Sequence, residues 1–350
     1  MMSLDETIAN IRPLDRALEG AAQQRLDCLT KPQGSLGRLE ELARRIALIQ
    51  ERVPPRSGPK LLFIFAADHG ITAEGVSAYP KDVTAQMTRN FLAGGAAINV
   101  LARHCGVDTE VVDVGVDHDF AGARGLRDCK IRRGTANFAR GPAMSRAEAL
   151  RAIAIGIELA QSAQDPFLLG AGDMGIGNTS SAAAILCALT GASAADAVGR
   201  GTGIDDAGLR RKIAAVEGGL AVNRPRADDP LDVLAKVGGL EIGAMTGVIL
   251  GAAARRVPLV LDGFISGAAA LLAQRLCPAV ADFLFASHLS VEPGHRRMLD
   301  RLRLAPLLDL QMRLGEGTGA CLLMSLIEAA VKIMGEMATF QSAGVKEKLP

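Results

Sequence analysis

The stretch GAGDMGIGNTSSAAAI, residues 170–185, joins a short apolar run to an alanine-rich segment through a glycine-rich turn. Glycines allow a strand to turn sharply into a helix that packs closely beside it. A helix N-terminus after such a turn also binds anions, usually phosphate, through its open backbone N–H groups and its dipole. The stretch therefore predicts a strand–turn–helix unit, used either for close packing or for holding an anion.

Similar short apolar runs recur from Lys60 onward, each followed by a polar or glycine-rich turn and a helical stretch. Strands that alternate with helices predict an α/β fold, here a doubly wound, mostly parallel sheet flanked by helices. Ligands of such sheets gather beyond the carboxyl ends of the strands. The runs are KLLFIFAADHG (60–70), TEVVDVGV (109–116), DPFLLGAGDMGIGN (165–178), VPLVLDGF (257–264) and ADFLFASHLS (281–290). The polar residues at their ends are Asp68, His69, Asp173, Asp262, Ser287 and His288.

Both ends of the chain have helical patterns instead. Ser3 and Glu6 form a capping-box signature, and apolar residues recur at helical spacing between Leu39 and Ile49. A last helix, expected over 320–337, is placed to pack on the N-terminal helices.

The composition excludes several classes of partner. Lys and Arg total 39 against 38 for Asp and Glu, so no broad basic field attracts nucleic acid or an anionic membrane. An aromatic content of 3% lacks the stacking platforms that single-stranded nucleic acid needs. The longest apolar run, 242–254, is shorter than the roughly 20 residues of a membrane span. We expect neither nucleic acid nor a membrane as partner.

The cellular compartment is predicted from the cysteines and the N-terminus. The six cysteines are far apart and include no CxxC pair, which indicates reduced thiols rather than a disulfide framework. The segment MMSLDETIANIRPLDR lacks the apolar core of a signal peptide. We expect a cytoplasmic protein.

Two further glycine-rich segments carry candidate functional residues. In GRGTGIDDAGLRRK (199–212), Lys212 is placed either to put a charge on a phosphate or to lie on a solvated helix face. In LGEGTGACL (314–322), Glu316 precedes an apolar helix. It is either a structural acid stabilised by the helix dipole or a partly desolvated general base with a raised pKa.

Other chemistries lack their motifs. The first glycine-rich turn lacks the lysine of a P-loop and does not make the full dinucleotide fingerprint of a strand, GxGxxG and a downstream acid. No GxSxG follows a strand. The sequence contains no HxxxH or HxH pair, so we expect no metal. The residues of a type that could ligate a metal are His69, His288, His295, Asp68 and Glu292.

Seven motifs, taken together and in this order, resemble the nicotinate-nucleotide:dimethylbenzimidazole phosphoribosyltransferase family over about residues 25–335. They are LTKPQGSLGRLEELA, FAADHGI, GDMGIGNTSSAAA, GTGIDD, LDGFISGAAALLA, SHLSVEPGH and RLGEGTGA. The resemblance implies transfer of phosphoribose from nicotinate mononucleotide to 5,6-dimethylbenzimidazole, giving α-ribazole 5′-phosphate and nicotinate for the nucleotide loop of cobalamin. It implies small-molecule substrates, no metal or other cofactor, and a homodimer. It also implies a large α/β domain (56–318) and a small helical domain formed by both chain ends (1–55 and 319–350).

The same resemblance assigns roles to residues of this sequence. Glu316 corresponds to the catalytic base, and the glycine-rich loops with Lys212 hold the 5′-phosphate. Family members often carry Glu at the position of Asp173, so the resemblance leaves the role of this aspartate open. Contact with ribose hydroxyls is one candidate role. The expected substrate-binding residues are Asp173, Gly175, Gly177, Asn178, Thr179, Gly201, Gly203, Lys212, Tyr79 and Gln86, the last two beside the benzimidazole. The alternative function is a non-catalytic sensor of a nucleotide or benzimidazole, which has no use for a base at Glu316.

Overall fold

A computed structural model describes residues 2–346 and contains a six-stranded sheet in the order β3-β2-β1-β4-β5-β6, with neighbouring strands parallel. The predicted α/β class is confirmed, and each of the five predicted runs contains a strand. The strands are β1 (Lys60–Ala67), β2 (Asp108–Gly115), β3 (Leu126–Asp128), β4 (Leu168–Met174), β5 (Leu259–Leu261) and β6 (Leu284–Ala286). The sequence did not predict β3, a short edge strand whose sequence LRD carries one apolar residue.

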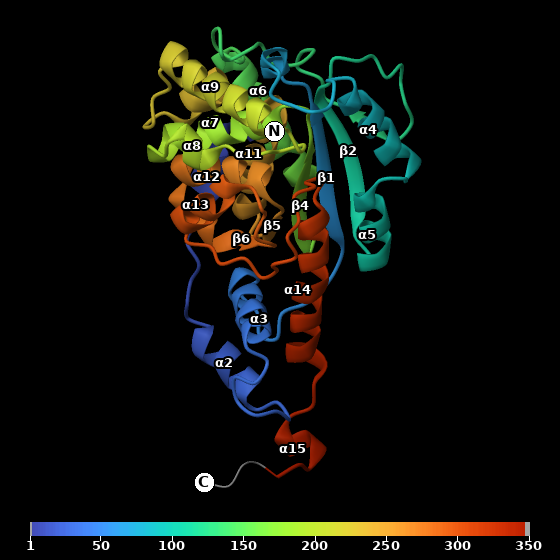
Figure 1. Cartoon of the computed structure of the whole chain (residues 1–350). Coiled ribbons are helices and arrows are strands. Elements are labelled where there is room, and N and C mark those ends of the chain that lie inside the picture. The colour runs from blue at the N-terminus through green and yellow to red at the C-terminus, as the bar shows by residue number, and fades with distance from the viewer. Residues whose placement is uncertain (1, 347–350) are drawn as a thin grey trace.

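The α-helices connect the strands and form both ends of the chain (Figure 1). They are α1 (Leu4–Asn10), α2 (Glu19–Asp27), α3 (Arg38–Ile49), α4 (Val83–Ala93), α5 (Ala97–Cys105), α6 (Arg146–Ser162), α7 (Asn178–Thr190), α8 (Ala194–Ala197), α9 (Asp206–Asn223), α10 (Pro230–Val237), α11 (Leu240–Ala254), α12 (Phe264–Leu276), α13 (Pro293–Leu302), α14 (Thr318–Glu336) and α15 (Phe340–Ala343). Two 3-10 helices, η1 (Gly70–Glu74) and η2 (Pro278–Phe283), complete the connections.

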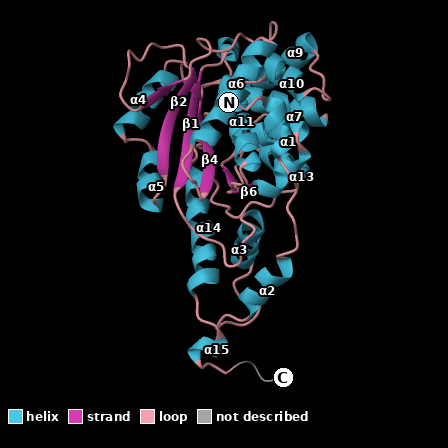
Figure 2. Cartoon of the chain, turned by 180° about the vertical axis from the view of Figure 1, so that it is seen from behind, coloured by secondary structure: helices cyan, strands magenta, loops and turns pink. Residues whose placement is uncertain are grey.

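Helices cover both faces of the sheet (Figures 1 and 2). Helix α11 packs across β1, β2 and β4 and lies very close to α6. Glycines permit this approach, since a Cβ on Gly156 would lie 1.9 Å from the Ala244 carbonyl oxygen and one on Gly247 would lie 1.9 Å from that of Ile153. Any larger residue at either position would force the two helices apart.

The two ends of the chain meet below the sheet in the view of Figure 1, where α2, α3, the lower part of α14 and α15 lie together. Helix α3 packs on α14 as the sequence predicted. The Thr30 N–H donates to the Ala338 carbonyl, and the Phe340 N–H donates to the Cys28 carbonyl. Helix α1 lies elsewhere, against α6 and α11. The division into two domains stays a prediction.

Helix α14 is long and apolar enough to cross a membrane, judged by length and composition alone. It packs against α3, α5, β4 and β5, and 56% of its most apolar window is buried inside the chain. The core helix of a globular protein has the same properties, so this helix is weak evidence for a membrane span.

Candidate active site

The strand order creates a point where neighbouring connections leave in opposite directions. The chain passes from β1 outward to β2 and β3, and then returns through α6 to β4 on the other side of β1. In an open α/β sheet the carboxyl ends at such a switch point are the usual place for a ligand. The loops after β1 and β4, and the segment before α14, meet there.

Glu316 lies at this edge in an unusual backbone conformation. Its φ is +63°, and its neighbours Gly315 and Gly317 have φ values of +82° and +92°. A non-glycine residue in this left-handed region is strained by roughly 1–2 kcal/mol, and such strain concentrates at functional sites. The side chain is 5% exposed, and burial raises the pKa of its carboxyl group. One backbone donor, the Ile98 N–H, lies 3.4 Å from its Oε2.

The loop around Glu316 is held by the ends of β4 and β5. A Cβ on Gly172 would lie 2.2 Å from the Glu316 carbonyl oxygen, so only glycine fits under this loop. The Asp262 carboxylate accepts hydrogen bonds from the N–H groups of Gly317, Gly319 and Ala320 at 3.1, 2.7 and 3.1 Å.

Asp173, at the end of β4, lies beside the same loop. Its carboxylate would be 3.2 Å from a Cβ on Gly315, and its Oδ2 accepts a 2.8 Å hydrogen bond from the Asn178 side chain. Burial, followed by the nearby Asp262, raises the pKa of Asp173 well above its ordinary value.

Lys212 is buried, with 1% of its surface exposed, so its interpretation as a residue of a solvated helix face is wrong. Its Nζ donates to Thr179 Oγ1 at 2.8 Å and to the Gly199 carbonyl at 3.1 Å. A Cβ on Gly201 would lie 3.0 Å from both Nζ and Thr179 Oγ1. Burial lowers the pKa of Lys212 to about 8, and Glu292 opposes that shift. Two glycine-rich loops far apart in sequence thus meet at one ammonium group.

The first turn of α7 has no side-chain cap. Its N-cap is Gly177, in the left-handed conformation, which has no side chain to cap the helix. The first N–H groups and the dipole of α7 therefore favour an anion, and Lys212 adds a positive charge at Thr179. Glu292 stands on the other side of this cluster, where its Oε1 accepts a 2.8 Å hydrogen bond from the Gly201 N–H.

His69 packs against the glycine-rich turn between β4 and α7. Its Nε2 lies 2.7 Å from Glu241 Oε1, and its Nδ1 lies 3.1 Å from Ser181 Oγ. A Cβ on Gly175 would be 3.2 Å from this ring and one on Gly177 would be 3.3 Å from its Cβ, so the ring fixes the turn by contact. His288 and His295 are buried near each other, with ring centroids 6.2 Å apart. Within residues 2–346, no group of three His, Cys, Asp or Glu residues has the arrangement of a metal site.

The structure does not bring every predicted residue to this cluster. Tyr79 is 55% exposed and lines a cavity of about 600 Å³ that also contains Asp68 and His69. Gln86 is exposed on α4. The segment before Tyr79 does reach the loop that contains Gly203, because the Ala78 N–H donates to Thr202 Oγ1 at 2.9 Å.

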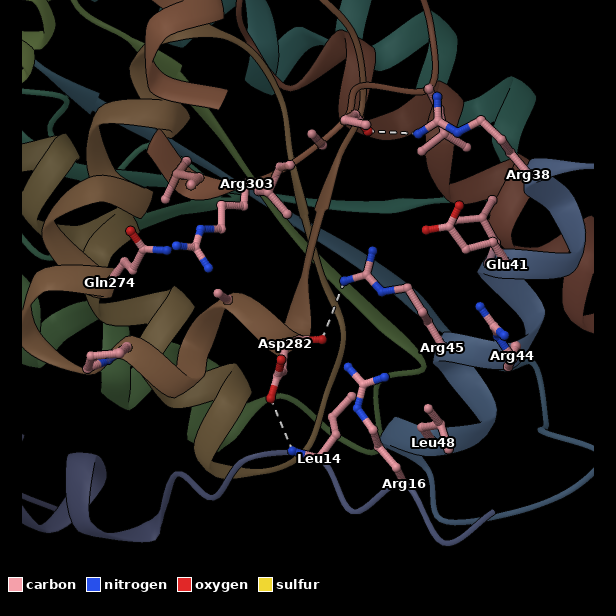
Figure 3. Close-up of a pocket in the computed structure, with 18 of the residues that line it drawn as sticks. Leu14, Arg16, Arg38, Glu41, Arg44, Arg45, Leu48, Gln274, Asp282 and Arg303 are labelled. Carbon is pink, nitrogen blue, oxygen red and sulfur yellow. Dashed lines mark hydrogen bonds between the residues drawn. The ribbon is translucent and has the colours of Figure 1, made fainter. Parts of the chain in front are cut away.

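A larger cavity of about 880 Å³ lies away from these residues, between α3 and the segment from η2 to α13 (Figure 3). Its arginines are largely used for structure. Arg45 donates to the Leu284 carbonyl at 2.8 Å and stacks on Phe285, and Arg38 donates to the Ala305 carbonyl at 2.8 Å. This cavity holds none of the predicted site residues, so we place the candidate active site at the switch point instead.

A buried carboxylate and a buried lysine beside two glycine-rich turns define an enzyme-like site for a phosphorylated substrate on a doubly wound fold. The comparisons with known proteins agree with this class. A family model described as phosphoribosyltransferase matches residues 11–345. The chain belongs to the nicotinate-nucleotide–dimethylbenzimidazole phosphoribosyltransferase family.

Relatives with that name cover nearly the whole chain. The protein from Geobacter metallireducens is 58% identical over 349 residues, 99% of each chain, and that from Geotalea uraniireducens is 57% identical over the same length and shares. A crystal structure of CobT from Thermus thermophilus is 51% identical and covers 95% of this chain and 99% of its own, with a TM-score of 0.91. The resemblance that the sequence motifs indicated is confirmed.

Proposed function

We propose that this chain transfers phosphoribose from nicotinate mononucleotide to 5,6-dimethylbenzimidazole, giving α-ribazole 5′-phosphate and nicotinate for cobalamin nucleotide-loop assembly. The observation that carries the site assignment is Glu316, a buried carboxylate held in a strained conformation at the switch point. Lys212, with Thr179, Gly201 and the first turn of α7, binds the 5′-phosphate.

The remaining predicted residues have the following roles in the proposal. Gly175 and Gly177 shape the turn before α7, Asn178 and Asp173 form a hydrogen-bonded pair beside the ribose, and Gly203 lies in the second loop. Tyr79 and Gln86 lie beside the benzimidazole.

The proposed reaction is a substitution at the anomeric carbon with inversion. A benzimidazole ring nitrogen forms the new bond to C1 of the ribose, and the bond from C1 to nicotinate breaks. Its electron pair returns to the nicotinate ring nitrogen, which is positively charged while bound, so the leaving group needs no acid. Glu316 takes the proton from the benzimidazole N–H, because the attacking ring would otherwise become cationic.

The pH dependence follows from the direction of the Glu316 shift. Burial raises the pKa of this carboxyl group, and only its ionised form accepts a proton. Turnover should therefore fall as the pH drops through this raised pKa. A protein that only senses a nucleotide or benzimidazole would release no nicotinate at any pH.

The test is nicotinate release from the mononucleotide, with and without dimethylbenzimidazole, by the wild type and by Glu316→Gln. We expect release that depends on the base and falls about 10²–10⁴-fold in the variant, with mononucleotide binding nearly unchanged. Glu336→Gln, at the exposed far end of α14, is the matched control and should keep full turnover. Near-normal turnover and an unchanged pH profile in Glu316→Gln would show that another residue is the base.

The proposal also covers the oligomeric state, the cellular compartment and the domain division of the chain. The small-molecule substrates follow from the enzyme family, and we propose a cytoplasmic homodimer with neither nucleic acid nor a membrane as partner. We propose residues 56–318 as the catalytic domain and the two chain ends, within 1–55 and 319–350, as the source of the small helical domain, with α1 packed apart from it on α6 and α11.

A further inference from the structure

The helix that follows Glu316 receives its N-terminal cap from a distant strand. Helix α14 begins at Thr318, and its N-cap Gly317 has no side chain. A capping side chain cannot replace this glycine easily, because the backbone there has φ +92° and a Cβ would lie 2.7 Å from Leu62. Asp262, directly after β5, accepts the N–H groups of Gly317, Gly319 and Ala320 instead.

Asp262 is itself fixed in place. It is 1% exposed, and the hydroxyl group of Ser287 donates to its backbone carbonyl at 2.8 Å. The N–H of Ser287 donates to the Leu261 carbonyl at 3.1 Å, which ties this contact to the ends of β5 and β6. His288 Nδ1 lies 3.0 Å from the Ser287 hydroxyl and 4.0 Å from the Asp262 carboxylate. The three N–H groups therefore bind to a carboxylate on a rigid part of the sheet.

On the other side of Glu316, the Gly315 carbonyl accepts hydrogen bonds from the N–H and the hydroxyl group of Thr318, a residue of the same turn, at 3.1 and 2.9 Å. Gly315 and Glu316 are both in the left-handed region, where a residue with a side chain is unstable unless its neighbours fix it. The Gly317 N–H, one residue after Glu316, ties this turn to the sheet through its hydrogen bond to Asp262. The direction of the Glu316 side chain thus depends on the anchor that follows it by one residue.

We propose that Asp262 is a positioning residue that keeps Glu316 at the switch point by holding the first N–H groups of α14. This inference rests on the proposed role of Glu316 as the base. The hydrogen bonds of the Asp262 carboxylate go to the start of α14 and not to the cluster of Thr179, Gly201 and Lys212, so its effect on catalysis is separate from phosphate binding.

The test is a double-mutant cycle of Asp262→Asn and Glu316→Gln, measured by nicotinate release. Asparagine keeps the shape of Asp262 but presents one amide nitrogen, which cannot accept an N–H. A displacement of about 1 Å at a reacting group costs on the order of 10²-fold in rate, so we expect kcat to fall by that factor with KM for the mononucleotide within about twofold. In the Glu316→Gln background the same substitution should change kcat by less than about threefold, because the group it positions is already lost.

The outcomes separate this inference from the proposed function. Full turnover in Glu316→Gln alone would overturn the proposed base. If Glu316→Gln is impaired but Asp262→Asn costs the same factor in both backgrounds, Asp262 does not act through Glu316 and the inference is wrong. A large rise in the mononucleotide KM would also contradict it, because that effect indicates general damage to the site.

Two further variants control for loss of activity through a folding defect. Asp229→Asn makes the same substitution at the N-cap of α10, away from the cluster, and should leave kcat unchanged. If Asp262→Asn shows no cooperative thermal unfolding, Ser287→Ala enters the same cycle, since it loosens Asp262 without removing the carboxylate. We expect it to cause a smaller loss of kcat that again disappears in the Glu316→Gln background, and equal losses in both backgrounds would refute the positioning role.

Discussion

Replacing Lys212 by methionine should stabilise the ligand-free chain below pH 8 and weaken its binding of the mononucleotide. Burial lowers the pKa of this lysine from 10.5 to about 8. Since a difference of one in pKa corresponds to about 1.36 kcal/mol, the buried charge costs roughly 3 kcal/mol of unfolding free energy. Methionine fills a similar volume without a charge.

The hydrogen bonds of Lys212 offset part of this gain. The lysine donates to Thr179 and to the Gly199 carbonyl, and each bond contributes about 1 kcal/mol. The net stabilisation expected for Lys212→Met at pH 7 is therefore about 1 kcal/mol. A residue that destabilises its own fold is typical of a site that is complete only with its ligand.

The sign of the pH dependence follows from which state binds the proton. Below pH 8 the lysine is protonated in both the folded and the unfolded chain, so its full cost is present. Between pH 8 and 10.5 only the unfolded chain holds the proton, so the unfolding free energy of the wild type rises with pH. The advantage of the methionine variant should therefore be largest below pH 8 and fade as the pH approaches 10.5.

Urea unfolding at several pH values, with and without nicotinate mononucleotide, measures both effects. The mononucleotide should raise the stability of the wild type and barely change that of Lys212→Met. Lys236→Met, a partly exposed position on α10, controls for the general loss of a lysine. The reasoning is refuted if Lys212→Met is less stable than the wild type at pH 7, or if the difference between them does not change with pH.

Two further predictions concern the anion site and the metal. Gly201→Ala should raise KM for the mononucleotide about tenfold and leave KM for dimethylbenzimidazole unchanged, because a Cβ there would lie 3.0 Å from Lys212 Nζ and from Thr179 Oγ1 in a backbone with φ +51°; equal changes in both KM values, by steady-state kinetics, would contradict this. Turnover should survive EDTA, since no metal-site arrangement exists within residues 2–346; a loss that a divalent ion restores would show that a metal is required.

The sequence predicted the sheet because its central strands are buried on both sides. Strand β1 is apolar from Leu61 to Ala67, and β2 and β4 contain shorter apolar runs. All three end in polar or glycine-rich turns, which is the pattern of a parallel sheet. Strand β3 is a partly exposed edge strand of three residues, so its sequence lacks the apolar pattern of a buried strand. The order of the strands in the sheet could not be predicted from the sequence either, because parallel strands pair through contacts that no local pattern specifies.

Site residues could be predicted from the sequence where a charged residue stands among glycines or apolar residues. Glu316 stands among glycines before an apolar helix, and this contrast pointed to it. Lys212 gave no such signal, since its burial depends on a loop 33 positions earlier in the sequence. Glu241 was missed although it is the one charged residue of α11, and a charge inside an otherwise apolar helix was the available clue.

Several buried carboxylates share the switch-point region, and the partners of Asp173, Glu241, Asp262 and Glu316 distinguish these four. Asp262 is bound by three backbone N–H groups, and Glu241 lies 2.7 Å from His69. Burial raises the pKa of Asp173 well above its ordinary value, and its Oδ2 already accepts a hydrogen bond from the Asn178 side chain. Glu316 has one long contact, 3.4 Å from the Ile98 N–H, and burial raises its pKa. The Glu316 carboxylate is weakly bonded and more basic than usual, which supports its role as the base.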